Sequence, residues 1–566
     1  MSQQAPPLAI FYHPDGFDTA SYDLMGRRAA GKNFLEAWIE RRGAETLHCV
    51  STSRKSFESF CTVAKACGAS GKAEWIGHDR PELLGPVGTL YFPAPDISEH
   101  AWRRYRRNPK GWSIIGVTHT ICTKAVMDGI SSWLRAPVEP WDAVICTSKA
   151  VRDSIETQMQ AEREFLQRRL GATTFSSPQL PIIPLGVPTG AFTPDEGIRA
   201  RARAAYGIGD DDLAAIFVGR LSIYGKAHPV PMFIALERAA RATGKRVHLL
   251  LVGWFANDSI RKAFESGLTF WCPSVTPHII DGRKDDLRHD AWQAGDVFVS
   301  LVDNIQETFG LTPVEAMAAG LPSVVSDWDG YRDTVRHGLD GFRIPTCAPP
   351  PVFGEALMDR YAADLDSYDY YLAKSAAMIV VDTEAAAKAL IELFNDPELR
   401  KRMGAAARQH AVERFDWQVV LGAYEDLATD LAARRKAAPD VDPKESRRWP
   451  ARLSPFEMFA NYPSRVPLMT DRVRLQVRNP SAALINIAHA ERAALASHDK
   501  FVERATRLFE AIGKAQAPTM AEIAAIDGKE QQGQMILTLL TMAKFGLISL
   551  DSASGADGPR KGMLGY

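Results

Sequence analysis

The chain has few cysteines and no long apolar run, and both absences restrict where it can work. Its seven cysteines are odd in number, scattered, and without the paired spacing of metal ligands, which argues against a disulfide framework and a zinc site. No apolar run approaches the roughly 20 residues that cross a bilayer, and the N-terminal segment lacks the pattern of a signal peptide. We therefore expect a cytoplasmic protein in a reducing compartment, for which any membrane contact is peripheral, at the inner face.

An excess of charge of one sign is also missing. Lys and Arg number 67 against 68 Asp and Glu, which gives a net charge of -1, and 46% of the residues are hydrophobic. This balance argues against a chain that coats nucleic acid, and the apolar content argues against a disordered one. We expect several globular domains.

What the sequence does contain is an alternation of short apolar runs and helical patterns. Leu8–His13 begins the series as a strand, and Gly31–Gly43 follows as an amphipathic helix that a glycine ends. The alternation predicts an α/β protein in which a first Rossmann-like half extends to about residue 195 and a second half of the same kind follows it.

Two glutamates bracket the start of a helix in the second domain. Asp296–Val302 is an apolar run typical of a buried parallel strand, and Pro313 suits the first turn of a helix that begins near Leu311. Glu307 and Glu315 would then face the crevice at the carboxyl edge of the sheet, where nucleotides bind. Gly310 permits close approach of a ligand, and the helix start offers unpaired N–H groups to an anion. The alternative is that both are ordinary solvated acids.

The stretch from Glu307 to Pro322, ETFGLTPVEAMAAGLP, resembles the signature of the retaining, nucleotide-sugar-dependent glycosyltransferases of family 4, which have the GT-B fold. The resemblance implies that Glu307 contacts hydroxyls of the donor sugar and that Glu315 binds the ribose. It also implies that the backbone of Phe309, Gly310, Leu311 and Thr312 meets sugar and phosphate. Thr308 stands where glycine is more usual. Pro181–Pro194 resembles the interdomain connector of this family, and Leu393–Trp417 resembles the end of its catalytic unit. The resemblance therefore implies two Rossmann-like domains, residues 1–190 and 191–435, that face one another across a cleft.

Two cations follow an earlier strand of the same domain. Arg220 comes just after the strand in FVGRLS, Gly219 beside it is expected to contact the donor, and Lys226 comes six residues after Arg220. Fixed cations at this edge suit the charge that develops on a leaving diphosphate, and the resembling family carries such a pair at a spacing one residue shorter. A surface Arg–Lys pair without a role is the alternative.

The first domain offers a histidine and a glycine. His119 lies just beyond the strand WSIIGVTHT, on a loop that faces the cleft, and the family resemblance makes it a donor-sugar contact; a structural histidine is the alternative. Gly31 resembles the glycine-bearing loop that approaches the donor phosphate, although the fuller Gly-Gly form is absent. Ser148 is expected to cap the helix that follows it.

Two other patterns suggest a binding site, and each has another interpretation that is favoured. Asp327-Trp328-Asp329 has the spacing of a divalent-metal site in a different glycosyltransferase fold, but it resembles the loop by which this family positions Gly330 and a following acid, Asp333. No metal or other cofactor is expected. The run from Trp102 to Trp112 carries five cations among aromatic residues, which would suit anionic lipid or a phosphorylated acceptor, yet solvated surface is the favoured interpretation.

The remaining segments fall outside the two-domain pattern. Residues 346–381 predict an inserted helical hairpin beside the cleft, and 436–470 are charged and proline-rich, as in a linker. Residues 471–566 predict a mainly helical, winged-helix-like accessory domain, in which Gly546–Leu550 would begin a wing. The helical stretch Glu530–Lys544 is nearly uncharged, so docking or homo-oligomer contact is preferred to nucleic acid binding.

The resemblance implies a retaining transfer of a hexosyl unit from a nucleoside diphosphate sugar to a hydroxyl acceptor, by front-side attack, in bacterial polysaccharide or glycoconjugate synthesis. The acceptor could be a glycan, a lipid-linked molecule or a protein, and the donor's base and sugar stay open. Two alternatives remain: a nucleotide-sugar epimerase of related fold, and a regulator that senses a nucleotide sugar and uses the C-terminal module.

Overall fold

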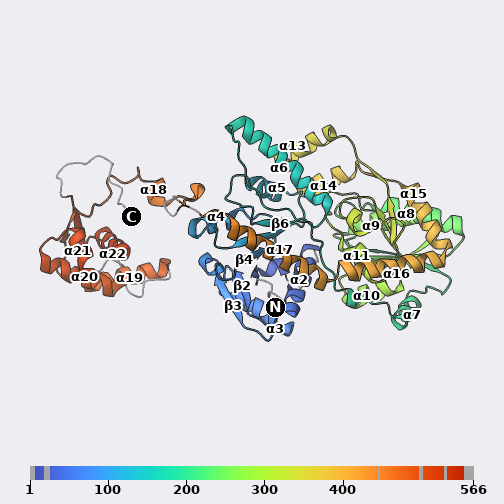
Figure 1. Ribbon diagram of the computed structural model, residues 1–566, viewed down its shortest axis with the longest axis horizontal. Helices are drawn as coiled ribbons and strands as arrows, with labels where there is room; N and C mark the ends of the chain where they lie inside the picture. The colour runs from blue at the N-terminus through green and yellow to red at the C-terminus, as the bar shows by residue number, and fades with distance from the viewer. Residues whose placement is uncertain are drawn as a thin grey trace. The chain divides into compact units, whose positions relative to one another are not determined.

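The computed structural model describes residues 7–17, 26–440, 442, 447–495, 501–527 and 532–552 (Figure 1). The chain divides into two compact units, Met1–Trp449 and Pro450–Tyr566. Unit 1 contains two six-stranded sheets, and we call the parts around them the first half and the second half. The predicted α/β architecture of two Rossmann-like halves is confirmed.

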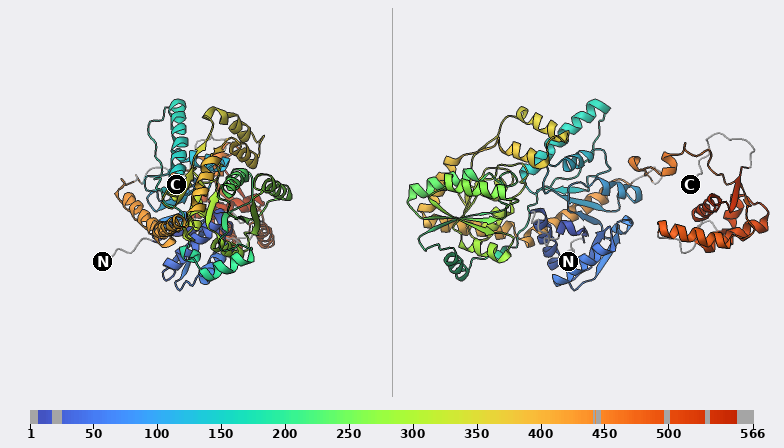
Figure 2. Two further views of the ribbon diagram at one scale, coloured as in Figure 1. Left: turned by 90° about the vertical axis from the view of Figure 1, so that its right-hand side faces the viewer. Right: turned by 180° about the vertical axis from the view of Figure 1, so that it is seen from behind.

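The first half is a parallel sheet in the order β3-β2-β1-β4-β5-β6 with helices on both faces (Figure 2). Strand β5, between β4 and β6, is buried along its whole length, as expected for a parallel sheet covered on both sides. The strands are β1 Ala9–Phe11, β2 Leu47–Ser51, β3 Ala73–Gly77, β4 Thr89–Phe92, β5 Ser113–Val117 and β6 Ala143–Ile145; the α-helices are α1 Pro14–Phe17, α2 Gly26–Arg42, α3 Arg54–Ala66, α4 Ser98–Arg107, α5 Lys124–Ser132 and α6 Lys149–Leu170.

The second half repeats the plan with the parallel order β12-β11-β10-β7-β8-β9. Because β7 and β10 are neighbours, the loops after them leave the sheet side by side at its carboxyl edge. The strands are β7 Leu213–Val218, β8 Val247–Gly253, β9 Val275–Asp281, β10 Val297–Ser300, β11 Ser323–Ser326 and β12 Gly341–Ile344; the α-helices between them are α8 Pro229–Thr243, α9 Asp258–Trp271, α10 Asp285–Ala294, α11 Leu311–Ala318 and α12 Tyr331–Thr334.

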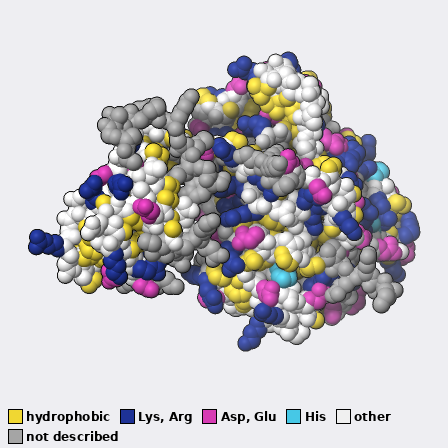
Figure 3. All heavy atoms as spheres, turned by 60° about the vertical axis from the view of Figure 1, so that its left-hand side comes forward, with side chains coloured by type: hydrophobic (Ala, Val, Ile, Leu, Met, Phe, Trp, Pro, Cys, Tyr) yellow, Lys and Arg dark blue, Asp and Glu magenta, His cyan; other side chains and the backbone are white. Residues whose placement is uncertain are grey.

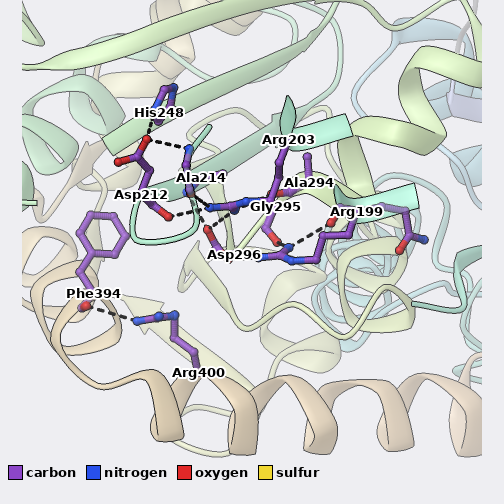
Figure 4. Close-up of polar contacts among 12 residues, drawn as sticks. Arg199, Arg203, Asp212, Ala214, His248, Ala294, Gly295, Asp296, Phe394 and Arg400 are labelled. Atoms are coloured by element: carbon purple, nitrogen blue, oxygen red, sulfur yellow. Dashed lines mark hydrogen bonds and ion pairs between the residues drawn. The ribbon is translucent and has the colours of Figure 1, made fainter. Parts of the chain in front are cut away.

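A polar network fixes the opposite, amino-terminal edge of this second sheet (Figure 4). Asp296, just before β10, pairs with Arg203 at 3.0 Å and with Arg199 at 2.5 Å, both on α7 Glu196–Ala205. The Asp296 carboxylate also accepts from the backbone N–H of Ala214 on β7, at 2.8 Å. The network therefore ties a helix and two strands together at the edge away from the β7 and β10 loops.

The second half is completed by α15 Thr383–Asn395 and α16 Pro397–Arg414, after which α17 Trp417–Ala437 returns to the first half (Figure 1). Trp417 and Tyr424 lie in the hydrophobic core beneath the first sheet. Gly186 must be glycine here, because a Cβ at that position would lie 2.3 Å from the Trp417 ring. At the end of α2, Arg41 and Arg42 pair with Glu425 at 2.7 and 3.1 Å, and Arg42 and Glu425 are buried.

Residues 346–381 form an inserted hairpin of two helices, α13 Glu355–Ala362 and α14 Tyr368–Ala376. The short strands β13 Thr346–Cys347 and β14 Val380–Val381 pair antiparallel at its base. The helices contact the start of α5 in the first half: the hydroxyl of Tyr361 accepts from the Lys124 backbone N–H at 3.3 Å, and the Tyr368 hydroxyl lies 3.3 Å from the Cys122 thiol.

The run Trp102–Trp112 is not uniformly a surface, because Arg104 is among the largest fully buried side chains. It forms a bidentate pair with Asp142, which is also buried, and donates to the carbonyl of Trp112 at 2.9 Å. Arg106 and Arg107 are exposed. Hence the interpretation of this run as a solvated face is wrong for one of its cations.

The described residues of unit 2 form four helices of eight or more residues, together with a two-stranded antiparallel sheet. Its elements are η4 Pro450–Arg452, α18 Pro455–Met458, β15 Arg472–Leu475, α19 Ser481–Leu495, α20 Phe501–Ala515, α21 Met520–Asp527, α22 Gln532–Lys544 and β16 Ile548–Asp551. The strand predicted to begin a wing, β16, pairs instead with β15 from before the helices, in the register Leu475↔Ile548. The residues that would complete a wing, 553–566, lie outside the described residues.

Acidic and basic side chains are both present on the face of the molecule seen in Figure 3, in keeping with the net charge of -1. Among the described residues, none of the helices is both long enough and apolar enough to cross a bilayer.

Candidate active site

The loop between β10 and α11 carries Glu307 and is organised by a buried asparagine. The Asn304 carboxamide oxygen accepts from the backbone N–H groups of Gln306 and Glu307, at 2.9 and 3.3 Å. Its nitrogen donates to the carbonyl of Lys226. One side chain therefore fixes the glutamate loop against the β7 loop. Asn304 is not among the site residues predicted from the sequence, although a polar residue just after an apolar run at the carboxyl edge is a usable signal.

Lys226 and Glu307 form an ion pair at the centre of this region. The Lys226 Nζ lies 2.5 Å from the Glu307 Oε2, and their side chains are only 15% and 17% exposed. Burial by itself would lower the pKa of Lys226 and raise that of Glu307, but the opposite charge outweighs burial in both. The pKa of Lys226 is held above its usual value and that of Glu307 below, so both groups are charged.

The turn from Gly219 to Lys226 also carries a second cation, Arg220. The Arg220 Nη2 donates to the carbonyl of Gly225 at 3.3 Å, which folds the turn back on itself. The Lys226 side chain passes over Gly219, where a Cβ would lie 3.3 Å from the Lys226 Cε. Gly219 also has a φ of +151°, a conformation that favours glycine. The structure thus brings the Gly219 and Arg220 turn to the Lys226–Glu307 pair.

Glu315 lies on α11, one of the helices that face this edge. Burial raises the pKa of its carboxyl group, and the positive charges of Arg288 and Lys226 oppose that rise. Phe309 is different, because its side chain is buried in the core and packs edge-on against Phe415, with ring centroids 6.0 Å apart. Only its backbone remains for a ligand, as the family resemblance implies.

Glycines press the glutamate loop against the loop that follows β11. Gly310, with a φ of +86°, caps α11, and a Cβ on it would lie 2.1 Å from the Tyr331 ring. A Cβ on Gly330 would lie 2.4 Å from the Phe309 Cα. Leu311 and Thr312 continue directly from this contact as the first turn of α11. The two loops are therefore locked together without room for a side chain at either glycine.

The first half meets the second half at Thr308. The Ser148 hydroxyl donates to the Thr308 carbonyl at 2.7 Å, and it also caps α6 by accepting from the Val151 N–H, as predicted. The Thr308 hydroxyl donates to the carbonyl of His119. The structure thereby places His119 beside the glutamate loop. Thr308, which the sequence marked only as a replaced glycine, is the residue that joins the halves here.

Gly31 lies differently from the prediction. Its helix α2 begins at Gly26, so Gly31 is inside the helix, where a Cβ would lie 2.2 Å from the carbonyl oxygen of Gly16. This close packing accounts for the glycine without a ligand, and its donor contact stays a prediction. The acid Asp327 is also accounted for locally, since it lies 3.6 and 3.5 Å from Arg332 and Arg343.

Asp303 gives the site a measurable pH dependence of stability. It is 4% exposed, and burial raises its pKa to about 7 from 3.8. Because the folded chain keeps a proton that the unfolded chain releases, the stability is full below about pH 4 and is lost as the pH rises through 7. Asp303→Asn should abolish that loss, which amounts to about 4 kcal/mol.

Urea unfolding between pH 4 and 8 measures this effect. The matched control is Asp211→Asn, at an exposed position before β7, which should leave the wild-type slope in place. A wild-type slope that persists in Asp303→Asn would contradict the assignment.

The comparisons with known proteins concern the family and the fold. The family model for glycosyl transferases group 1 matches residues 213–361. A D-inositol 3-phosphate glycosyltransferase of Streptomyces bingchenggensis is 26% identical over 376 residues, which are 62% of this chain and 68% of that protein. An alpha-maltose-1-phosphate synthase of Mycolicibacterium smegmatis is 24% identical, over 66% of this chain and 91% of its own length.

Other matches are shorter or concern the fold alone. A phosphatidyl-myo-inositol mannosyltransferase of Mycobacterium leprae is 32% identical over 32% of this chain, and 39% of that protein is covered. The crystal structure of Anabaena HepE in complex with UDP has a TM-score of 0.50 at 14% identity, covering 75% of this chain and all of that one. The family match, the relatives and the two-sheet fold together support a family 4 glycosyltransferase with the GT-B fold.

Proposed function

We propose that this enzyme transfers a hexosyl unit from a nucleoside diphosphate sugar to a hydroxyl acceptor with retention of configuration. The observation that carries the proposal is the buried Lys226–Glu307 pair, at 2.5 Å, on neighbouring loops at the carboxyl edge of the second sheet. A cation that is held charged and largely out of water is suited to a leaving diphosphate.

Each residue then has a role that its position supports. Lys226 and Arg220 hold the leaving diphosphate, and Glu307 keeps Lys226 charged while it accepts from a hydroxyl of the donor sugar. Glu315 binds the ribose, and His119 borders the sugar from the first half. The acceptor attacks from the side of the departing diphosphate, whose oxygen takes the acceptor proton. No metal or other cofactor is assigned a part in this step.

The donor and acceptor classes rest on the relatives. HepE is described in complex with UDP, which places UDP-sugars first among the donors to test. Two relatives are named for inositol phosphate and phosphatidylinositol, so phosphorylated inositols join glycans, lipid-linked molecules and proteins as acceptors. Synthesis of a bacterial polysaccharide or glycoconjugate fits all of these. An epimerase or a nucleotide-sugar-sensing regulator finds no support among the relatives.

The accessory unit is assigned to protein contacts. Its helix α22 carries a single basic residue, Lys544, in its last turn and no acidic residue in its first, which suits docking or self-association better than nucleic acid. Peripheral contact of the protein with the inner face of the membrane, within a cytoplasmic location, remains part of this proposal.

A panel of UDP-, GDP- and ADP-sugars tests the donor assignment by thermal shift, because a ligand that binds only the folded state raises the apparent melting temperature. We expect one nucleotide class to raise it. The responding donor is then incubated with the acceptors, and the anomeric configuration of the product is read by NMR. The absence of any shift in folded protein, or a product with inverted configuration, would overturn the proposal.

A further inference from the structure

Asp329 is held in an unusual backbone conformation inside the candidate site. Its φ is +35°, in the region that residues other than glycine seldom occupy. Such conformations persist where the surroundings impose them, and they collect at functional sites. Two contacts hold this one: Gly330 is pressed on the backbone of Phe309, and the Trp328 Nε1 donates to the carbonyl of Asn304 at 2.8 Å.

The carboxyl group of Asp329 has one oxygen in use and one without a partner. Its Oδ1 accepts from the N–H of Gly330. Within the part of the chain that the structure describes, its Oδ2 is buried and makes no hydrogen bond. Buried polar atoms are nearly always satisfied, so an unsatisfied one at a site calls for a partner that the chain itself does not supply.

The charges around Asp329 limit what that partner can be. Burial, and then the negative charge of Glu307, raise the pKa of Asp329 well above its usual value. The charge of Lys226 lowers this pKa, and that of Asp333 raises it further. Lys226 is already matched by Glu307. These effects favour the protonated form of Asp329, whose carboxylic acid can both donate and accept a hydrogen bond. A phosphate group mainly accepts hydrogen bonds, whereas a sugar hydroxyl both donates and accepts. A sugar hydroxyl therefore matches both abilities of this carboxylic acid.

We propose that Asp329 binds a hydroxyl of the donor sugar and so helps to decide which sugar the site accepts. The inference rests on the proposed function and deepens it. The hydroxyl is that of the sugar ring, because Asp329 interacts with Glu307, the proposed sugar contact, across two loops that the glycines lock together. A site built to hydrogen-bond a hydroxyl discriminates strongly against a sugar that lacks it.

Calorimetric binding of a nucleoside diphosphate sugar and of the bare nucleoside diphosphate tests this assignment. Asp329→Gly removes the side chain at a φ that glycine adopts freely, and Asp329→Asn keeps the size in case the loop needs it. We expect Asp329→Gly to weaken binding of the nucleotide sugar by about tenfold to a hundredfold, because one hydrogen bond is lost. Asp329→Asn, whose carboxamide can also donate and accept, should bind the nucleotide sugar nearly as wild type does. Binding of the bare diphosphate should be unchanged. Deoxy-sugar donors should identify the hydroxyl. The donor that lacks this hydroxyl should bind wild type more weakly than the full donor does, whereas Asp329→Gly should bind the two donors equally well.

The matched control is Asp327→Asn, the same change two residues earlier, where the carboxylate faces Arg332 and Arg343. It should leave both affinities as in wild type. Wild-type affinity for the nucleotide sugar in Asp329→Gly would overturn the inference, and so would an equal loss for sugar and bare diphosphate. Failure of the wild-type protein to bind any nucleotide sugar would instead refute the proposed function, on which this inference depends.

Discussion

Replacing Glu307 by glutamine lowers the rate of transfer by about a hundredfold to a thousandfold. The substitution keeps the size of the side chain but removes the charge that faces Lys226 at 2.5 Å. Lys226 then loses the interaction that holds its pKa up and its ammonium group in place, and the donor sugar loses a strong hydrogen-bond acceptor. Initial rates at saturating donor and acceptor measure the loss in kcat.

The stability of this variant must be followed together with its activity. Removing one partner of a buried ion pair destabilises a fold by about 3–5 kcal/mol, so circular dichroism should establish that the protein is folded at the assay temperature. Lys226→Met combined with Glu307→Gln should cost much less than the sum of the two rate losses, because the two residues act as one unit. Glu265→Gln, on the outer surface of α9, is the control. A folded Glu307→Gln protein with a near-normal rate would refute the role.

Replacing Arg104 by methionine destabilises the first half by about 3–5 kcal/mol. The side chains of Arg104 and Asp142 are 1% and 0% exposed, and methionine leaves the Asp142 carboxylate buried without its cation. The carbonyls of Trp112 and Pro137 also lose a donor. Urea unfolding followed by tryptophan fluorescence measures the effect, since Trp112 lies in the same core.

Arg106→Met is the matched control for this prediction. Arg106 lies on the same helix, two residues further on, and is exposed, so its replacement should change the free energy of unfolding by less than about 0.5 kcal/mol. Asp142→Asn introduced into Arg104→Met should restore part of the loss by removing the unpaired charge. Equal stability of Arg104→Met and Arg106→Met would show that the buried pair contributes nothing.

The parts of this fold that the sequence predicts are those written in local patterns. Apolar runs such as Ser113–Val117 can only be strands covered on both faces, and their alternation with helices leads to two parallel sheets. That a binding site lies at the carboxyl edge of a parallel sheet can likewise be predicted from local patterns. For that reason the loop of Glu307 and the turn of Lys226 could be expected near one another before the structure placed them in contact.

The parts that the sequence leaves open depend on partners distant in the chain. Arg104 shares its helix with exposed arginines, and nothing near it in sequence reveals that Asp142 is its partner. The pairing of β16 with β15 joins residues on either side of four helices. Asn304 and Thr308 act through contacts with Lys226, Ser148 and His119 that only the folded halves create. Site residues were therefore easier to predict than the residues that position them.

The inserted hairpin has the form of a removable module. The chain enters and leaves it through β13 and β14, where Thr346 lies opposite Val381 and Cys347 opposite Val380. Residues opposite one another in an antiparallel ladder have Cα atoms about 5 Å apart, a gap that a tight turn closes. Replacing α13 and α14 by a tight turn between β13 and β14 would therefore leave the chain connections of both six-stranded sheets unchanged.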